Sequence, residues 1–124
     1  MRTGLSLKVL AVGAAMAVAM PASAVEAPFE KDLRRLAELL GSLHYLRNLC
    51  GDEGTTWRGE MEKLLAAENP DEARRAMLVA HFNQGYRSFG STYTSCTPAA
   101  VSAIDRFMAE GRELTREIAT RYGN

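Results

Sequence analysis

Apolar side chains recur every three or four residues along most of the chain, the spacing that places them on one face of an α-helix. Gly51 follows the first apolar stripe as a natural helix end. The stripe consists of Phe29, Leu33, Leu36, Leu40, Leu43, Leu46 and Cys50. A second, shorter stripe covers residues 57–65; its helix should begin near residues 55–56 and end near Asn69. No segment alternates apolar and polar residues over a sustained length, so the sequence predicts an all-α fold.

Two further helices are marked by a proline at the first helical position. Asn69, Pro70 and Glu72 form a capping-box pattern, which predicts the start of a third helix. Its expected apolar side consists of Ala73, Met77, Ala80, Phe82 and Phe89. Thr97 and Pro98 repeat the start signal, and the fourth helix should continue through Val101, Ile104, Met108, Leu114 and Ile118. Four helices joined by short loops predict a small up-and-down bundle of antiparallel neighbours.

Residues 1–24 have the composition of a secretory signal peptide. Two basic residues precede an apolar run at 9–20, and Ala22 and Ala24 occupy the small-residue positions of a cleavage site. A membrane-spanning helix needs about 20 apolar residues, so a run this short favours cleavage over anchoring. We therefore expect export to the periplasm as a single helical domain, residues 25–124, with no membrane span after cleavage.

The charge of the mature chain argues against a nucleic-acid partner. Cleavage would remove Arg2 and Lys8 from the 15 basic residues and leave all 15 acidic residues, so 13 positive charges face 15 negative ones. The resulting net charge of −2 provides no general attraction to polyanions.

Cys50 and Cys96 are the two cysteines of the chain. An even pair in an oxidising compartment predicts a disulfide. The first helix should end at Cys50 and the fourth should start just after Cys96, so both lie at the same end of an antiparallel bundle. A free nucleophilic thiol is the alternative, but it would need a protected site of lowered pKa that the sequence does not indicate.

The sequence lacks the motifs of common hydrolases and metalloenzymes, G-x-S-x-G, H-E-x-x-H and C-x-x-C. The histidines, His44 and His81, lie within predicted helices, and acid pairs such as Glu60 and Glu62 suit a solvated helix face. We therefore predict no catalytic residue, no metal and no cofactor.

Six residues near the cysteine end are candidates for binding. The arginines among them would either neutralise a helix C-terminus or anchor a carboxylate, and the tryptophan would either cover the core or contact a partner. We expect Phe82 and Phe89 to point inward and the tyrosines to stay exposed. The candidates are Arg47, Trp57, His81, Tyr86, Arg87 and Tyr93.

Four short segments together resemble a known family. They read YLRNLCG at 45–51, WRGEM at 57–61, FNQGYRSF at 82–89 and YTSCT at 93–97. This pattern resembles an uncharacterised family of short exported proteins from alphaproteobacteria, defined as a domain of unknown function. The resemblance implies an envelope location and a paired cysteine, but it implies no activity, substrate or catalytic residue.

The sequence as a whole favours a non-enzymatic periplasmic protein that binds another envelope component, either a protein or a cell-wall component. The alternatives are a small hydrolase or modulator that acts on cell-wall polymer, and a binder of a small anionic ligand. An enzyme should show a pocket that unites a histidine with a carboxylate. A binding protein should show an exposed apolar patch around Trp57, Tyr86 and Tyr93.

Overall fold

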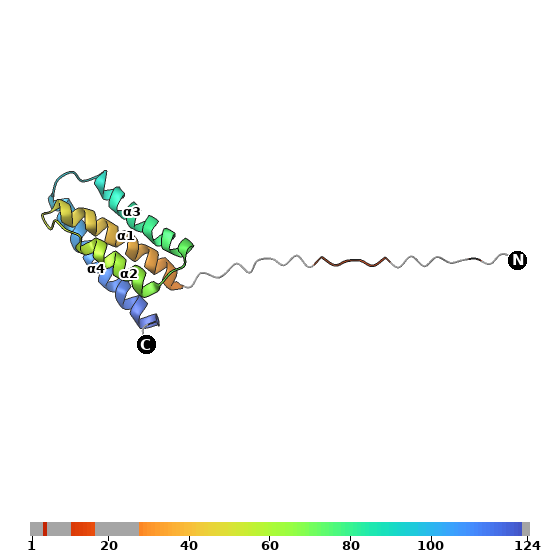
Figure 1. Cartoon of the computed structure of the whole chain (residues 1–124). Coiled ribbons are helices and arrows are strands. Elements are labelled where there is room, and N and C mark those ends of the chain that lie inside the picture. The colour runs from red at the N-terminus through yellow and green to blue at the C-terminus, as the bar shows by residue number, and fades with distance from the viewer. Residues whose placement is uncertain (1–3, 5–10, 17–27, 123–124) are drawn as a thin grey trace.

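The computed structural model describes residues 4, 11–16 and 28–122, and the last of these ranges folds into four helices. The helices run alternately up and down (Figure 1). They are α1 (Pro28–Leu49), α2 (Thr56–Glu68), α3 (Glu72–Gly90) and α4 (Pro98–Tyr122). The predicted all-α bundle is confirmed. The predicted cleavage site after Ala24 lies outside the described residues, and among the described helices none is long and apolar enough to span a membrane.

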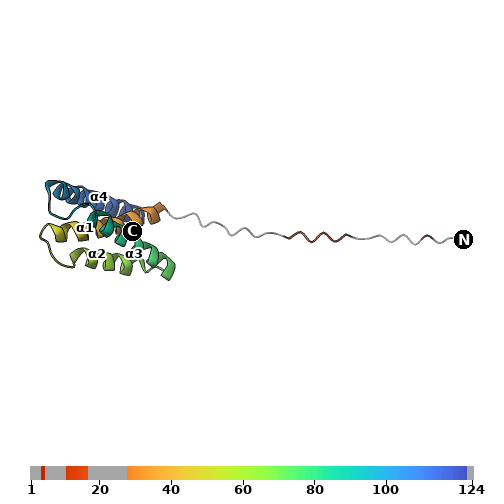
Figure 2. The same ribbon diagram turned by 90° about the horizontal axis from the view of Figure 1, so that it is seen from above.

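α1 is the central helix, and each of the other three packs against it. All five residues from Leu39 to Leu43 are buried, so this part of α1 is enclosed on every side. Figure 2 shows α4 on one side of α1, with α2 and α3 on the other. Because α1 stands between them, α2 and α4 do not pack extensively against each other.

The closest approach between helices is the crossing of α1 and α3 at two glycines. A Cβ atom added to Gly41 would lie 1.9 Å from the carbonyl oxygen of Phe82. One added to Gly85 would lie 2.0 Å from the carbonyl oxygen of Glu38. The buried Ser42 hydroxyl lies at the same crossing and donates to the Glu38 carbonyl at 3.0 Å. Gly85 is therefore present in α3 because the two backbones touch there.

The core consists of two clusters along α1. The first contains Leu33, Ala37, Leu40, Met61, Leu65, Leu78 and Phe82. The second lies nearer the cysteines and contains Leu43, Leu46, Ala100, Ala103 and Ile104. Phe82 is buried as predicted, and Phe89 is half-buried against the second cluster.

The predicted start of the third helix is wrong by two residues. Asp71 is the N-cap of α3, because its Oδ1 accepts a hydrogen bond from the Arg74 backbone N–H at 2.8 Å. Asn69 instead ends α2 in the left-handed conformation, with φ at 42°, and its N–H donates to the Leu65 carbonyl. Asparagine tolerates that conformation better than most residues.

The predicted apolar side of the third helix is also partly wrong. Ala73, Met77 and Ala80 are exposed. The face that packs on α1 is formed by Leu78, Phe82, Gly85 and Phe89, which follow one another at spacings of four, three and four.

The start of α4 and the disulfide agree with the sequence predictions. The Thr97 hydroxyl oxygen caps α4 by accepting from the Ala100 N–H at 3.1 Å. Cys50 and Cys96 form a disulfide, with their Cα atoms 4.9 Å apart. It links the end of α1 to the loop before α4. The Tyr45 hydroxyl also holds this loop, because it donates to the carbonyl of Tyr93.

Candidate functional site

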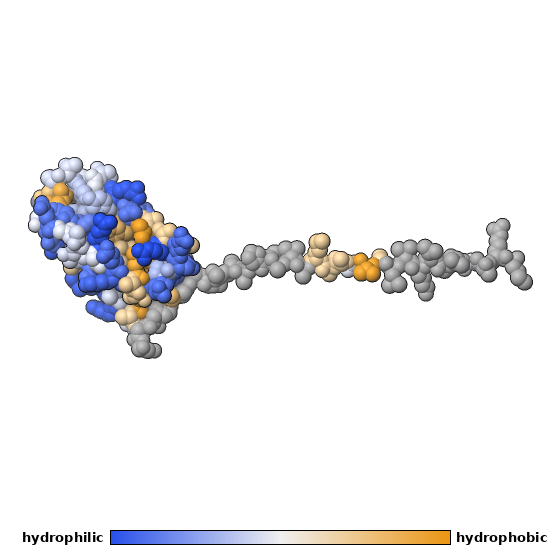
Figure 3. Space-filling model, viewed as in Figure 1, coloured by the Kyte–Doolittle hydropathy of each residue, from blue (hydrophilic) through white to orange (hydrophobic). Residues whose placement is uncertain are grey.

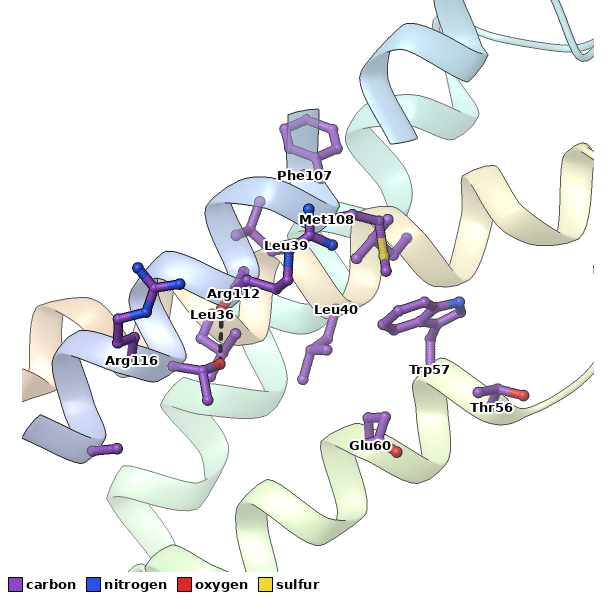
Figure 4. Close-up of a pocket in the computed structure, with 14 residues that line it drawn as sticks. Leu36, Leu39, Leu40, Thr56, Trp57, Glu60, Phe107, Met108, Arg112 and Arg116 are labelled. Carbon is purple, nitrogen blue, oxygen red and sulfur yellow. Dashed lines mark hydrogen bonds between the residues drawn. The ribbon is translucent and has the colours of Figure 1, made fainter. Parts of the chain in front are cut away.

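A slot of about 600 Å³ lies between α2 and α4, with α1 as its floor (Figure 4). We call it the α2–α4 slot. The α1 residues that line it are Leu36, Leu39, Leu40 and Leu43. The α2 residues are Thr56, Trp57 and Glu60, and the α4 residues are Phe107, Met108, Gly111, Arg112, Thr115, Arg116 and Ala119.

The slot is apolar. Its floor is made of leucines, of which Leu39 is 0%, Leu43 2% and Leu40 8% exposed. Side chains from the two walls cover this floor. The volume falls within the usual range for small-molecule sites. Figure 3 shows that hydrophobic surface over the middle of the helical domain is bordered by hydrophilic residues.

Trp57 closes one end of the slot. It lies in the first turn of α2 and packs against both core clusters. Its indole Nε1 is buried and has no hydrogen-bond acceptor among the described residues. A buried, unpaired N–H is uncommon in native proteins. Trp57 is therefore both part of the core and part of the candidate site.

A bidentate ion pair between Arg35 on α1 and Glu110 on α4, here called the fork, links the two helices beside the slot. Arg35 donates from Nε to Oε1 of Glu110 at 2.7 Å, and from a terminal nitrogen to Oε2 at 2.9 Å. These hydrogen bonds raise the pKa of Arg35 and lower the pKa of Glu110. A bidentate pair of this kind also sets the orientation of the two side chains. The fork therefore defines the position of the α4 wall.

The remaining charges on the slot are distributed unevenly. Glu60 on the α2 wall pairs with Lys63 at 3.0 Å, and Arg116 on the α4 wall pairs with Glu113 at 3.2 Å. Arg112 makes no ion pair within the part of the chain that the structure describes. Figure 4 places Arg112 between Trp57 at one end and Arg116 toward the other. Arg112 is thus the uncompensated charge on the slot.

A second, smaller groove of about 360 Å³ lies between α2 and α3. It brings together His44, Glu62 and Tyr86, with arginines at 58 and 75. Burial, and then the charge of Arg58, lowers the pKa of His44. The groove does unite a histidine with a carboxylate, but its lining includes no serine, threonine or cysteine to act as a nucleophile. Among the described residues, no group of three His, Cys, Asp or Glu side chains is placed to hold a metal.

The three aromatic candidates from the sequence do not form one patch. Trp57 lines the α2–α4 slot, whereas Tyr86 lines the smaller groove. The centroid of the Tyr86 ring lies 5.5 Å from the ring centroid of His44 and 5.4 Å from the ring centroid of Tyr45. Tyr93 is half-buried, not exposed as expected, and its ring stacks on Phe89 at 6.1 Å.

The other three candidates lie outside the linings of both grooves. Arg47 pairs with Asp52 at 3.3 Å, just after α1 ends. Arg87 donates to the carbonyl of Asn83 at 3.3 Å, within α3. These contacts fit charge stabilisation near a helix C-terminus. His81 is half-buried on α3, and its Nδ1 is buried with no hydrogen-bond partner among the described residues.

Most of the α4 wall was not among the sequence candidates. Met108 lies in the predicted apolar stripe, but Phe107, Gly111 and Arg112 do not. Their only signal in the sequence is a small residue, Gly111, between a bulky apolar pair and an arginine.

The fold and the slot define a class of protein: a disulfide-bonded, all-helical domain with an apolar ligand-sized slot against its central helix. The chain belongs to a family of proteins of unknown function, DUF2385, whose sequence profile matches residues 28–122. This match covers all four helices and confirms the resemblance to a domain of unknown function. No curated protein matches the chain, and neither does any solved structure.

Proposed function

We propose that the protein is exported and acts without catalysis, by binding the apolar part of another envelope component in the α2–α4 slot. The observation that carries the proposal is the slot itself. It is a surface cleft of about 600 Å³ with a mostly apolar lining, within the size range of small-molecule sites. The signal-like leader and the disulfide support an extracytoplasmic location.

Binding is favoured over hydrolysis by the chemistry of the two grooves. The α2–α4 slot offers leucines, Trp57, Phe107 and Met108, which bind by excluding water. The smaller groove holds a histidine and a carboxylate, but no serine, threonine or cysteine lines it as a nucleophile for them to activate. The larger groove therefore defines the proposed function.

Filling the slot should abolish binding without unfolding the protein. Gly111 lines the slot, and a Cβ added there meets nothing within 4 Å. Gly111→Leu should therefore place a side chain in the slot, while gaining helix propensity of about 0.5–1 kcal/mol. Trp57 is the only tryptophan in the chain, so its fluorescence reports on the slot directly. Dodecyl amphiphiles of any head group, kept below their micelle concentrations, should change the fluorescence of the wild type but not that of the variant.

Gly59→Leu is the matched control for this experiment. Gly59 also lies in a helix and also has nothing within 4 Å of an added Cβ, but it does not line the slot. It should bind like the wild type. Equal binding by Gly111→Leu and the wild type would refute the slot as the binding site.

Export should be visible in the mass of the recovered protein. If residues 1–24 are a cleaved leader, the intact mass of protein from the periplasm should correspond to a chain that begins at Val25, or within a residue or two of it. Recovery of the full-length chain from the cytoplasm would contradict export.

A further inference from the structure

We infer that the ligand of the α2–α4 slot is a single-chain carboxylic acid, that is, a fatty acid, whose chain lies between the α2 and α4 walls and whose carboxylate meets Arg112. This inference rests on the proposed function and names its ligand class.

The shape of the slot favours one alkyl chain. The slot offers little exposed floor, because Leu39, Leu40 and Leu43 are at most 8% exposed and Leu36 is half-buried. A single methylene chain needs less width than an α-helix, which with its side chains is about 10 Å across. The α4 wall runs from Phe107 to Ala119, about 18 Å of helix, which suits a chain of medium length.

The charges favour an anionic head group. Arg112 lies on the slot and has no ion-pair partner among the described residues, whereas Glu60 on the opposite wall is already paired with Lys63. A guanidinium presents two parallel N–H groups that match the two oxygens of a carboxylate. One uncompensated positive charge also matches the single negative charge of a fatty acid.

The test uses the disulfide-bonded protein, expressed from the full sequence, and three ligands with twelve-carbon chains, the carboxyl carbon of dodecanoate included. These are dodecanoate, dodecyl maltoside and dodecyltrimethylammonium, each kept below its micelle concentration. Calorimetry and Trp57 fluorescence should show one dodecanoate per chain, bound about fivefold more tightly than the neutral ligand, as a partly exposed ion pair would allow. Decanoate should bind about fifteenfold more weakly than dodecanoate, at about fourfold per buried methylene.

Two arginine variants assign the head group. Arg112→Gln should lower dodecanoate affinity to that of dodecyl maltoside and leave maltoside binding unchanged. Arg87→Gln removes the same charge from α3, outside the slot, and should bind dodecanoate like the wild type.

The outcomes separate this inference from the proposed function. Equal binding of all three head groups would overturn the fatty-acid assignment and leave the slot as an apolar site. Tighter binding of dodecyl phosphate, or of an acidic helical peptide, would overturn it in favour of a phosphate or a protein ligand. Binding of many dodecanoate molecules per chain would overturn it as well. If no amphiphile binds, the proposed function itself fails.

Discussion

Replacing Gly85 with alanine should destabilise the domain by about 3 kcal/mol or more, the upper range for forcing extra atoms into a packed core. The added methyl group would lie 2.0 Å from the Glu38 carbonyl oxygen and 2.9 Å from the Ser42 hydroxyl. The first of these neighbours is backbone, so no side-chain rotation relieves the overlap. α1 and α3 would have to separate along their whole crossing. Gly41→Ala should act in the same way, because its methyl group would lie 1.9 Å from the Phe82 carbonyl.

Glycine-to-alanine changes elsewhere in the helices supply the control. Gly59→Ala and Gly111→Ala are chemically identical substitutions, but nothing lies within 4 Å of either added Cβ. Each should raise stability by about 0.5–1 kcal/mol through helix propensity. Urea unfolding followed by circular dichroism would measure all four variants. If Gly85→Ala unfolds at the same urea concentration as Gly59→Ala, the helix backbones are not in contact at this crossing.

The same crossing explains why the face of the third helix was predicted incorrectly. Hydrophobic periodicity counts apolar side chains, and Gly85 has none, although it is one of the most tightly packed residues of α3. Met77 has a large apolar side chain but is 45% exposed, because it lies beside the buried face and not on it. Where backbones touch, the smallest residue marks the contact, and a count of apolar residues does not detect it.

The start of the third helix was ambiguous for a different reason. Asn69 and Asp71 can both cap a helix. Pro70, which lies between them, fits either the first turn of the third helix or the position just after the second helix has ended. The structure resolves this by ending α2 at Asn69 and starting α3 at the cap provided by Asp71. Thr97 and Pro98 have no such competitor, and the predicted start of α4 is confirmed.

The floor of the slot could be predicted from sequence, but its opening could not. Leu36, Leu40 and Leu43 belong to the predicted stripe of the first helix, and Trp57 was a candidate binding residue. Leu39 lies outside that stripe and is 0% exposed, since α1 is enclosed on several sides and not on one. The distance between α2 and α4 depends on their separate packing against α1. No local pattern in either helix encodes that distance.

Removing the disulfide should lower the free energy of unfolding by about 4 kcal/mol, by the chain-entropy relation for a loop closed across about 46 residues. The Cys50→Ala, Cys96→Ala double variant would show this as a shift in urea unfolding. The reduced wild type should unfold like that variant. Domains of this size have about 5–15 kcal/mol of total stability, so the loss is a large fraction of it.

Loss of the disulfide should nevertheless leave the slot intact in the folded population. The disulfide acts at the cysteine end of the bundle, where the Tyr45 hydroxyl still holds the loop at Tyr93. The α4 wall is positioned further along α1, by the fork between Arg35 and Glu110. Trp57 should therefore respond to dodecyl ligands in the double variant as in the wild type, at temperatures well below unfolding. An unchanged unfolding midpoint would show that packing alone holds this end together, and a folded variant with no ligand response would show that the disulfide positions the slot.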